Sequence, residues 1–461
     1  MNGGRASGAA APSGRRQALV YLLAVAVLAE VCAGVVGLSY VRAAGRPGTL
    51  VTAPLGGSRA DARPAPPDLH PAGDRSLQVR RLLDHRAAAL LRRDRAGWLA
   101  GIDPRAAAFR AKQAAVFDAL AAVPLTAWQY SMNPDLERAL GAGVAQRYAA
   151  PVWTPVVTLR YALRDVDGEP TERTMVFTFV RRAGRWYLAS DADAAADGTR
   201  TWRGLWDFGR VLARRGRSSL VLAHPGHAGL LATYVRAVDD AVPAVTAVWG
   251  PGWRRQVAVL LPDTQTEMAA LVGARYALAR IAAVAIADYA DSAAGTARGQ
   301  RVVVNPVNLD RLNSLGREIV LRHEITHVAS RAATSETMPT WLVEGFADYV
   351  GYSDTGLPVG VVAQDLRTEV RAGHWPGTLP ADRDYRSDAP GLAVAYETGW
   401  TACRFIASRA GPAGLVRFYR LVGTGGRTRT GAVEVALRQV LRTGYAGFVA
   451  QWRGAVRAEL G

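Results

Sequence analysis

Cysteine and histidine are scarce in this sequence, which limits the kinds of site it can build. Only 2 cysteines occur in 461 residues, and Cys32 lies in an apolar N-terminal stretch where it cannot usefully pair with Cys403. A disulfide framework and a cysteine-bound zinc site are therefore excluded. Any zinc site must combine some of the 7 histidines with carboxylates.

Lysine is almost absent as well. Lys112 is the only lysine among 56 basic residues, and the formal net charge is +17. A charge of this size usually indicates nucleic acid or an anionic membrane surface as a partner. However, the arginines are scattered rather than clustered with aromatic residues. Their excess over lysine, together with abundant alanine and glycine, is typical of a GC-rich coding sequence, so we expect no nucleic-acid partner.

A long hydrophobic run covers residues 17–41 and contains a single charged residue, Glu30. It is long enough to cross a hydrocarbon core of about 30 Å as a helix. The preceding tail, residues 1–16, ends in two arginines, which favours a cytoplasmic N-terminus. We expect an uncleaved single-pass anchor in the cell membrane with the later domains outside the cytoplasm; the alternative is a cleaved signal peptide. Residues 42–75, rich in Pro, Gly and Ala, are the expected linker.

The pattern changes at residue 76, where two helical segments precede four segments with the alternation of antiparallel strands. The helices are expected at residues 77–95 and 104–122, and the strands at 127–132, 154–163, 171–181 and 186–189. This order predicts an α+β domain over residues 76–200. It resembles the cone-shaped NTF2-like fold, which hosts enzymes and inert modules alike, and we expect a sensing, binding or spacer module. Residues 201–218 are the expected connector to the next domain.

The clearest chemistry lies at His323, Glu324 and His327, which read His-Glu-x-x-His in a proline-free apolar segment with helical period. Four residues along a helix turn by about 400°, so the two histidines project from one face, one turn apart. Imidazoles at this spacing can occupy two corners of a zinc tetrahedron. Glu324 projects about 100° away and can act on the attacking water as a general base without binding the metal. The alternative is a core helix that contains histidines by chance.

A catalytic zinc ion needs a third protein ligand and an open fourth position. The candidate is Glu344, in a second segment with helical period at residues 341–349. Asp348 lies one turn later on the same face. From there its carboxylate can accept the free ring N–H of a zinc-binding histidine. The two segments together predict one zinc ion per chain.

His-Glu-x-x-His followed by Glu-Gly-x-Ala-x-Tyr resembles the gluzincin metallopeptidases, in particular the aminopeptidase-like branch often called peptidase MA. The resemblance implies a zinc ion held by His323, His327 and Glu344, with Glu324 as base and proton shuttle. Further along, Tyr396 opens a Tyr-Glu-x-Gly sequence that is similar to an element of that branch, whose tyrosine hydrogen-bonds the oxyanion. The alternative for Tyr396 is an ordinary core or surface residue.

The resemblance covers residues 219–461, for which it implies a mixed sheet and a helical subdomain that closes a cleft. Two features depart from it. His327 and Glu344 are separated by 16 residues, fewer than in typical aminopeptidases of the branch. The Gly-x-Met-Glu-Asn sequence that captures a free amino terminus in those enzymes is also absent, so exopeptidase specificity is unsupported.

A short run of residues, Val302, Val303, Val304 and Asn305, ends at Pro306 just before the histidine-bearing segment. Because proline is tolerated at the edge of a sheet and not at its centre, the run is predicted to be an edge strand. An edge strand can pair with an extended peptide, and the resembling family binds substrate in this way. The alternative is a strand that only packs under the helix.

Two expectations concern the residues before this run. A helix over residues 228–242 is expected to stop at Pro243. His224 and His227, like the later His374, belong to no motif, and we expect them to be structural or surface residues.

These observations predict a membrane-anchored zinc peptidase that acts on a peptide or protein substrate outside the cytoplasm. A competing hypothesis is a zinc-containing binding protein that uses a peptidase fold to hold a peptide or envelope ligand, although such a protein has no need of the general base Glu324. Zinc-dependent hydrolysis of a non-peptide bond is a third hypothesis. The sequence leaves open the substrate, endo- or exo-action and the oligomeric state.

Overall fold

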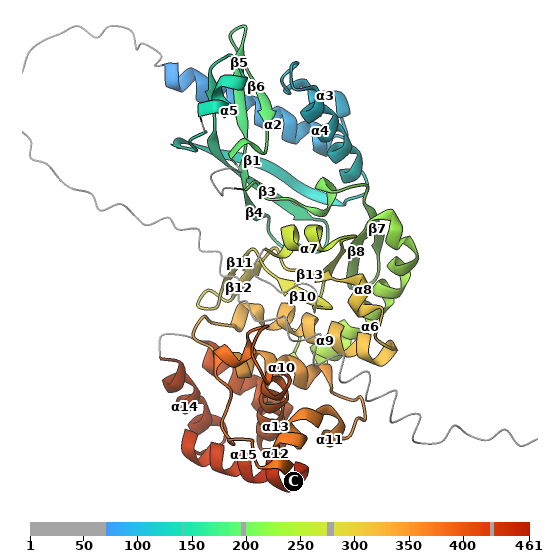
Figure 1. The fold of residues 1–461 in the computed structure, drawn as a ribbon, viewed down its shortest axis with the longest axis vertical. Helices are drawn as coiled ribbons and strands as arrows, with labels where there is room; N and C mark the ends of the chain where they lie inside the picture. The colour runs from blue at the N-terminus through green and yellow to red at the C-terminus, as the bar shows by residue number, and fades with distance from the viewer. Residues whose placement is uncertain (1–70, 141, 195–199, 274–280, 425–427) are drawn as a thin grey trace, which may run out of the picture.

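A computed structural model of the protein describes residues 71–461, except 141, 195–199, 274–280 and 425–427. The expected tail and anchor, and most of the linker, lie outside the described residues. Within the described ranges, no helix combines the length and the apolar character needed to cross a membrane. The fold is mixed α and β: an N-terminal part, a central sheet and a C-terminal group of helices follow one another along the long axis (Figure 1).

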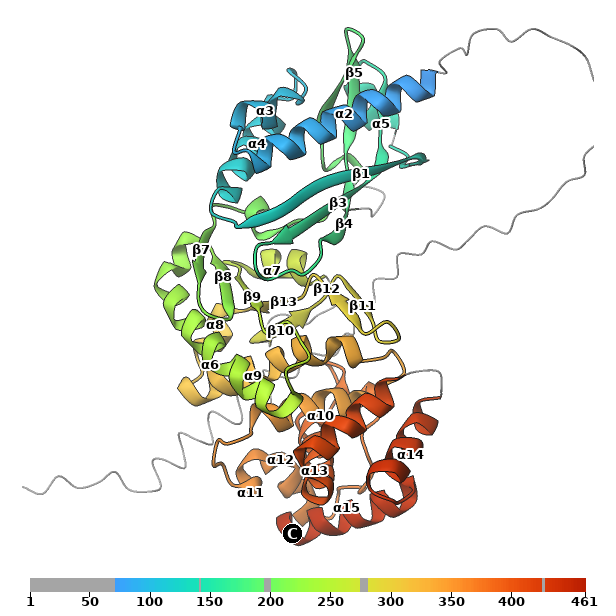
Figure 2. The ribbon, with the colours of Figure 1, turned by 180° about the vertical axis from the view of Figure 1, so that it is seen from behind.

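The N-terminal part, residues 71–194, packs helices against two small antiparallel sheets. Its helices are α2 (Pro71–Leu91), α3 (Arg95–Ala100), α4 (Ala107–Leu120) and α5 (Ala142–Arg147), and its strands are β1 (Leu125–Glu137), β2 (Val152–Trp153), β3 (Pro155–Leu163), β4 (Thr171–Val176), β5 (Thr178–Arg182) and β6 (Arg185–Ser190). The strand orders are β1–β3–β4 and β2–β5–β6. α2 packs along β1 (Figure 2). The predicted order of helices followed by antiparallel strands is confirmed.

Two boundaries differ from the prediction. α2 begins at Pro71, inside the expected linker, because proline fits the first turn of a helix, where its missing N–H is not needed. The strand predicted at residues 171–181 is two strands of different sheets, and the chain changes sheet at the buried Phe177. No glycine or proline occurs in this stretch, so no turn signal marks the change.

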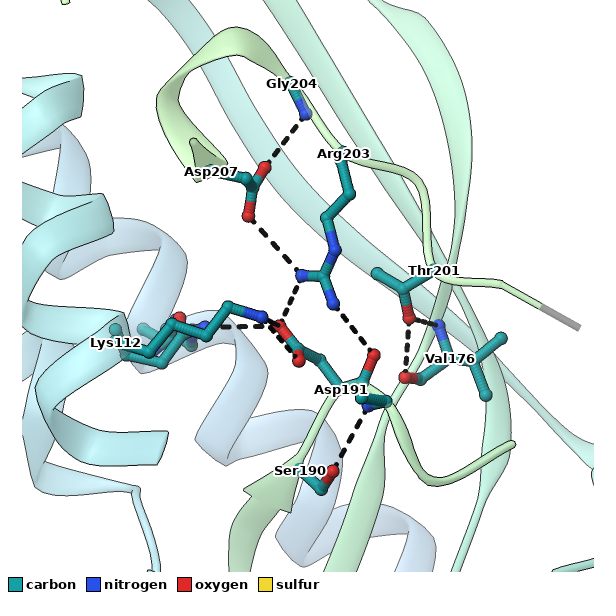
Figure 3. Close-up of polar contacts among 11 residues, drawn as sticks. Lys112, Val176, Ser190, Asp191, Thr201, Arg203, Gly204 and Asp207 are labelled. Atoms are coloured by element: carbon teal, nitrogen blue, oxygen red, sulfur yellow. Dashed lines mark hydrogen bonds and ion pairs between the residues drawn. The ribbon is translucent and has the colours of Figure 1, made fainter. Parts of the chain in front are cut away.

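The residues that lead out of the N-terminal part are held by a buried polar network (Figure 3). Arg203 pairs with Asp191, directly after β6, and with Asp207, in the short helix η2 (Leu205–Asp207). Lys112 of α4 donates to the same Asp191 carboxylate, at 2.9 and 3.1 Å. The expected connector is therefore bound to the N-terminal part along its first half.

A five-stranded mixed sheet forms the centre of the molecule. In spatial order its strands are β10 (Ala283–Ile286), β13 (Arg301–Val304), β9 (Val257–Leu261), β8 (Ser219–Ala223) and β7 (Leu212–Arg215). β8, β9 and β13 are parallel, whereas β10 and β7 run antiparallel to their neighbours and form the two edges. A hairpin of β11 (Tyr289–Asp291) and β12 (Thr296–Arg298) lies between β10 and β13 in the chain.

The prediction that Val302, Val303, Val304 and Asn305 form an edge strand is wrong. The three valines belong to β13, which pairs with β10 on one side and β9 on the other, and all three are 0% exposed. The short helix α8 (Pro306–Leu309) begins at the proline, with Asn305 as its cap. The proline therefore lies beyond the strand ladder and carries no information about the strand's place in the sheet. The edge strand next to β13 is β10.

The predicted stop at Pro243 is also wrong. Helix α6 (Leu231–Trp249) begins three residues later than expected and continues through the proline. A proline inside a helix removes the hydrogen bond to the carbonyl four residues earlier. Here that carbonyl belongs to Asp239, and it accepts a hydrogen bond from Nη2 of Arg217 at 2.9 Å instead. The side chain from a neighbouring segment thus stabilises a helix that the local sequence interrupts.

The remaining helices surround the sheet and form the C-terminal group. They are α7 (Gln265–Val272), α9 (Ser314–Ser330), α10 (Thr340–Gly351), α11 (Val359–Val362), α12 (Gln364–Ala372), α13 (Leu392–Gly423), α14 (Arg429–Val440) and α15 (Tyr445–Leu460), with the short 3-10 helices η3 (Pro225–Leu230), η5 (Arg331–Ala333) and η6 (Asp382–Tyr385). The long α13 bends at Gly411, whose φ of 74° is left-handed.

The central sheet is buried on both faces. On one face Val221 and Val259 pack in the same hydrophobic cluster as α6 and α9. On the other face Leu222 and Leu260 share a second cluster with Trp128 in the core of the N-terminal part. The N-terminal part therefore covers the back of the sheet whose front carries the histidine-bearing helix.

Candidate metal centre

The two histidines of the His-Glu-x-x-His sequence lie on α9, a helix that is buried over most of its length. Asn313 caps its first turn by accepting the N–H of Gly316 at 2.7 Å. His323 and His327 project from the same face, as predicted, and their Nε2 atoms are 3.1 Å apart. Because each ring presents the same nitrogen, both side chains face a common point.

Glu344 of α10 faces this point as well. Its Oε2 atom is 3.4 Å from Nε2 of His323 and 3.4 Å from Nε2 of His327. Ligand atoms around a tetrahedral zinc ion are about 3.3 Å apart when the bonds are about 2.0–2.1 Å long. Among the described residues no donor meets this buried Oε2 with hydrogen-bond geometry, and a buried carboxylate oxygen without a donor needs a cation. The three side chains therefore fit a zinc ion.

Asp348 lies behind His323, as the one-turn spacing from Glu344 predicts. Its Oδ1 atom is 2.8 Å from Nδ1 of His323, which fixes the ring so that Nε2 points to the centre. Burial lowers the pKa of His323, but the carboxylates of Asp348 and Glu344 outweigh it and raise that pKa above its usual value. Burial opposes the charge on Glu344 too, yet the two histidines lower its pKa to about 2.

The position of α10 is fixed by two contacts near its ends. Gly351 lies so close to α9 that a Cβ atom there would be 3.1 Å from the carbonyl oxygen of Ile319. At the start of α10, the Asp382 carboxylate accepts the N–H of Thr340 at 3.0 Å. Glu344 sits between these contacts, so its carboxylate has little freedom to move away from the histidines.

Glu324 lies beside the three converging side chains and is not one of them. Its Oε2 atom accepts the backbone N–H of Ala285, on the edge strand β10, at 2.7 Å. Burial raises the pKa of Glu324 above its usual value, in spite of the nearby His323 and His327. A carboxylate with a raised pKa accepts a proton more readily near neutral pH, which is what a general base needs.

Tyr396 lies on α13 and is buried. Its ring centroid is 5.1 Å from that of Tyr385. Burial, and after it the carboxylates of Glu344 and Asp348, raise the pKa of Tyr385, so this second tyrosine is close to the candidate centre. The hydroxyl of Tyr385 donates to the carbonyl of Ala395 at 2.9 Å. The role of Tyr396 at an oxyanion stays a prediction.

Glu397, the next residue of the Tyr-Glu-x-Gly sequence, has a contact that sequence analysis did not foresee. Its carboxylate accepts the N–H of Asp365 at 3.3 Å and that of Leu366 at 2.6 Å, in the first turn of α12. Burial raises the pKa of Glu397 to about 8. The glutamate therefore joins α13 to the first turn of α12.

Sequence analysis also missed Ala285 and Arg331, which meet at the edge strand. Nη2 of Arg331 donates to the carbonyl of Ala285 at 2.9 Å. Ala285 lies in an alanine-rich stretch that carries little strand signal. Arg331 follows His327 by four residues, and that spacing was the signal that could have found it.

The other histidines considered are away from the centre. Nε2 of His224 is 3.2 Å from Glu267, and Nε2 of His227 is 3.1 Å from Asp263. These pairs join the segment after β8 to the loop after β9 and to the first turn of α7. His374 is mostly exposed, with 72% of its side-chain surface accessible. Their expected structural or surface character is confirmed.

Comparison with known proteins gives no match: no family model fits this chain, and no curated protein is similar to it. Function must therefore be inferred from the geometry of the site itself.

Proposed function

We propose that this protein is a zinc-dependent peptidase of the gluzincin type, in which His323, His327 and Glu344 hold the zinc ion. The observation that carries the proposal is the convergence of three buried ligand atoms at the spacing of a tetrahedral site, with Asp348 orienting His323 from behind. When bound, zinc would polarise the scissile carbonyl and lower the pKa of the attacking water.

Glu324 is the proposed general base. Its carboxylate takes a proton from the attacking water and delivers it to the nitrogen of the leaving amine. The hydrogen bond from Ala285 orients this carboxylate, and its raised pKa supports the base role. Tyr396 is the proposed donor to the negatively charged oxygen of the tetrahedral intermediate.

The extended substrate is proposed to pair with the edge strand β10. The central strand β13, which the sequence suggested for this role, is already paired on both sides. In an antiparallel pair, residues that exchange hydrogen bonds alternate with residues whose polar groups point away. The N–H of Asn305 donates to the carbonyl of Ala282 at 2.8 Å, so Ala283 and Ala285 are the residues that point away from β13. The N–H and C=O of Ala283 and the C=O of Ala285 are the groups that a bound peptide would meet, because the N–H of Ala285 is held by Glu324.

We also propose that residues 17–41 anchor the chain in the cell membrane and that the N-terminal part is an NTF2-like module. The hydrophobic run supports the first proposal, and the packing of helices on two antiparallel sheets supports the second. Separation of membrane and soluble fractions, with protease added outside spheroplasts, tests the anchor. Recovery of the full chain in the soluble fraction would contradict it.

The peptidase proposal is tested by comparing the full chain with Glu324→Gln. Zinc content is measured by elemental analysis, and cleavage of a mixed peptide library is followed by mass spectrometry. We expect one zinc ion per chain in both proteins and cleavage by the parent chain alone. Glu336→Gln, the same change at an exposed glutamate, is the matched control and should cleave as the parent does.

Three other outcomes have distinct meanings. Zinc without cleavage in either protein would favour the binding-protein hypothesis. Full activity of Glu324→Gln would overturn the proposed mechanism. The absence of bound zinc from the intact chain would overturn the metal centre and the proposal with it.

A further inference from the structure

Arg331 lies on the same side of its helix as the two histidines. It follows His323 by eight residues and His327 by four, and its φ of −49° and ψ of −45° continue the geometry of α9. Since four residues turn by about 400°, its side chain leaves the helix about 40° from that of His327 and two turns beyond His323. Glu324 leaves the helix about 100° from His323, close to the direction of Arg331. Both side chains reach the edge strand β10.

The guanidinium group of Arg331 has no carboxylate partner among the described residues. Nη2 donates to the carbonyl of Ala285 at 2.9 Å, and the buried Nε has no acceptor. Other arginines close to the sheet are paired differently: Arg301 with Asp167 and Arg173 with Asp288. Within the part of the chain that the structure describes, Arg331 is therefore a half-buried cation beside the candidate centre without a counter-ion.

The two outward-facing groups of Ala285 are both occupied, one by a side chain of α9 and the other by the first side chain of η5, which follows α9 directly. Its N–H is bound by Glu324 and its C=O by Arg331. A peptide that pairs with β10 competes for this carbonyl, because an added strand donates its N–H groups to the outward-facing carbonyls of the edge strand. Once the peptide takes the carbonyl, Arg331 loses its acceptor. A half-buried guanidinium without an acceptor then favours an anionic group, and carboxylates match its planar donors best.

We infer that Arg331 is a specificity residue that binds a carboxylate of the substrate, close to the bond that is cleaved. This inference rests on the proposed peptidase function. The carboxylate is either the C-terminal group of the peptide or the side chain of an aspartate or glutamate. Both sources offer the same chemistry to the guanidinium, so they are distinguished by experiment.

The test uses the full chain and one mixed peptide library prepared in three forms. The first form has free C-termini, the second has C-terminal amides, and the third has free C-termini with every Asp and Glu replaced by Asn and Gln. Cleavage rates are measured at low peptide concentration, where they report kcat/KM, and peptide binding is measured in parallel on Glu324→Gln, alone and combined with each arginine variant. The arginine variants are Arg331→Met and Arg331→Lys, and Arg317→Met is the control. Arg317 is also half-buried on α9 and also donates to a backbone carbonyl, that of Leu312 at 2.7 Å.

Removal of the substrate carboxylate that Arg331 binds should lower kcat/KM of the parent chain by about 10- to 100-fold. This is the factor expected for a hydrogen bond between charged groups. Arg331→Met should show no such dependence, Arg331→Lys should keep part of it, and Arg317→Met should match the parent. A loss with the amidated library assigns the C-terminal carboxylate, and a loss with the library free of Asp and Glu assigns a side chain. Melting temperatures and zinc contents establish that each variant is folded.

The inference is overturned if the parent and Arg331→Met discriminate equally between the three libraries. In that case the peptidase proposal still stands, because the libraries are cleaved. If the parent cleaves nothing, the peptidase proposal fails, and carboxylate-dependent binding that disappears in the Arg331→Met variant still supports the inference. If no library is cleaved or bound, both are overturned.

Discussion

Gly345 and Gly399 meet backbone to backbone where α10 crosses α13. A Cβ atom on Gly345 would be 2.4 Å from both the carbonyl carbon and the carbonyl oxygen of Gly399. A Cβ atom on Gly399 would be 2.9 Å from the carbonyl oxygen of Trp341. Backbone atoms cannot rotate away as side chains do, so neither position has room for a side chain. The two glycines therefore set the distance between the helix of Glu344 and the helix of Tyr396.

Replacement of Gly345 by alanine is expected to push α10 away from α13 and to displace Glu344. Such overpacking lowers the free energy of unfolding by about 1–3 kcal/mol and should weaken zinc binding as well. Thermal melting and competition with a zinc chelator measure the two effects. In contrast, Gly454→Ala changes an exposed glycine in α15 with no atom within 4 Å of the new Cβ. Gly454→Ala should raise the free energy of unfolding by up to about 1 kcal/mol. Equal melting temperatures for Gly345→Ala and the parent would refute the packing argument.

Asp348→Asn is expected to lower zinc affinity by about 10- to 100-fold. The carboxylate holds the Nδ1 side of His323 at 2.8 Å, and a neutral amide in its place orients the ring less strongly and makes it a weaker ligand. The helices should remain folded because the substituted side chain keeps the same shape. Competition with a chelator of known affinity gives the measurement, and Asp240→Asn, at an exposed position of α6, is the control. An unchanged zinc affinity would show that Asp348 has no role in orienting the histidine.

The convergence of the side chains at the candidate centre could be predicted from the sequence, because their directions are set mainly by helix geometry. His323 and His327, and likewise Glu344 and Asp348, are separated by one turn, and a helix places such residues on one face whatever surrounds it. The edge strand could not be predicted in this way. Whether β13 or β10 lies at the edge depends on which segments pair across long distances in the chain, and a short apolar run carries no record of its partners.

The error at Pro243 has the same origin in tertiary contacts. Pro243 stops a helix only if nothing replaces the hydrogen bond it removes, and Arg217, from a neighbouring segment, supplies that bond. The packing of the N-terminal part against the central sheet is a second feature that depends on tertiary contacts. In the structure Trp128 shares a hydrophobic cluster with Leu222 of the central sheet, which no local pattern in either segment indicates.

The contact between the N-terminal part and the sheet contains a buried ion pair whose loss should be costly. Arg301 of β13 and Asp167 of the turn after β3 form two hydrogen bonds of 2.7 Å, with side chains only 3% and 4% exposed. Asp167→Ala leaves the guanidinium group buried and unpaired, so the free energy of unfolding should fall by about 3–5 kcal/mol. Urea denaturation followed by tryptophan fluorescence measures the change.

The matched control for this pair lies in the same turn. Glu169 pairs with Arg298 at 2.6 Å, but these side chains are 64% and 39% exposed. Glu169→Ala should therefore change the stability by less than about 1 kcal/mol. Equal effects of the two substitutions would show that the buried pair does not fix the N-terminal part to the sheet.

Glu397 should make stability depend on pH between its unfolded and folded pKa values. In the unfolded chain its pKa is near 4.5, and burial raises the folded value to about 8. Between these values the folded state binds more protons than the unfolded state, so the free energy of unfolding falls as the pH rises through this window. At pH 5 the side chain is protonated in the fold and carries no buried charge, whereas above pH 8 the charged form is enclosed with only two backbone donors, those of Asp365 and Leu366.

Glu397→Gln replaces the carboxyl group with a neutral group of the same shape and should remove this dependence. The stability of the parent relative to the variant is expected to decrease by a few kcal/mol from pH 5 to pH 8.5, with most of the change above pH 5 and below pH 8. Urea denaturation at four pH values measures it, and subtraction of the two curves cancels the titration of all other groups. The exposed Glu336→Gln should give a flat difference curve over the same range. A flat curve for Glu397→Gln would mean that the folded carboxyl ionises near its ordinary pKa, and that its two backbone hydrogen bonds offset the effect of burial.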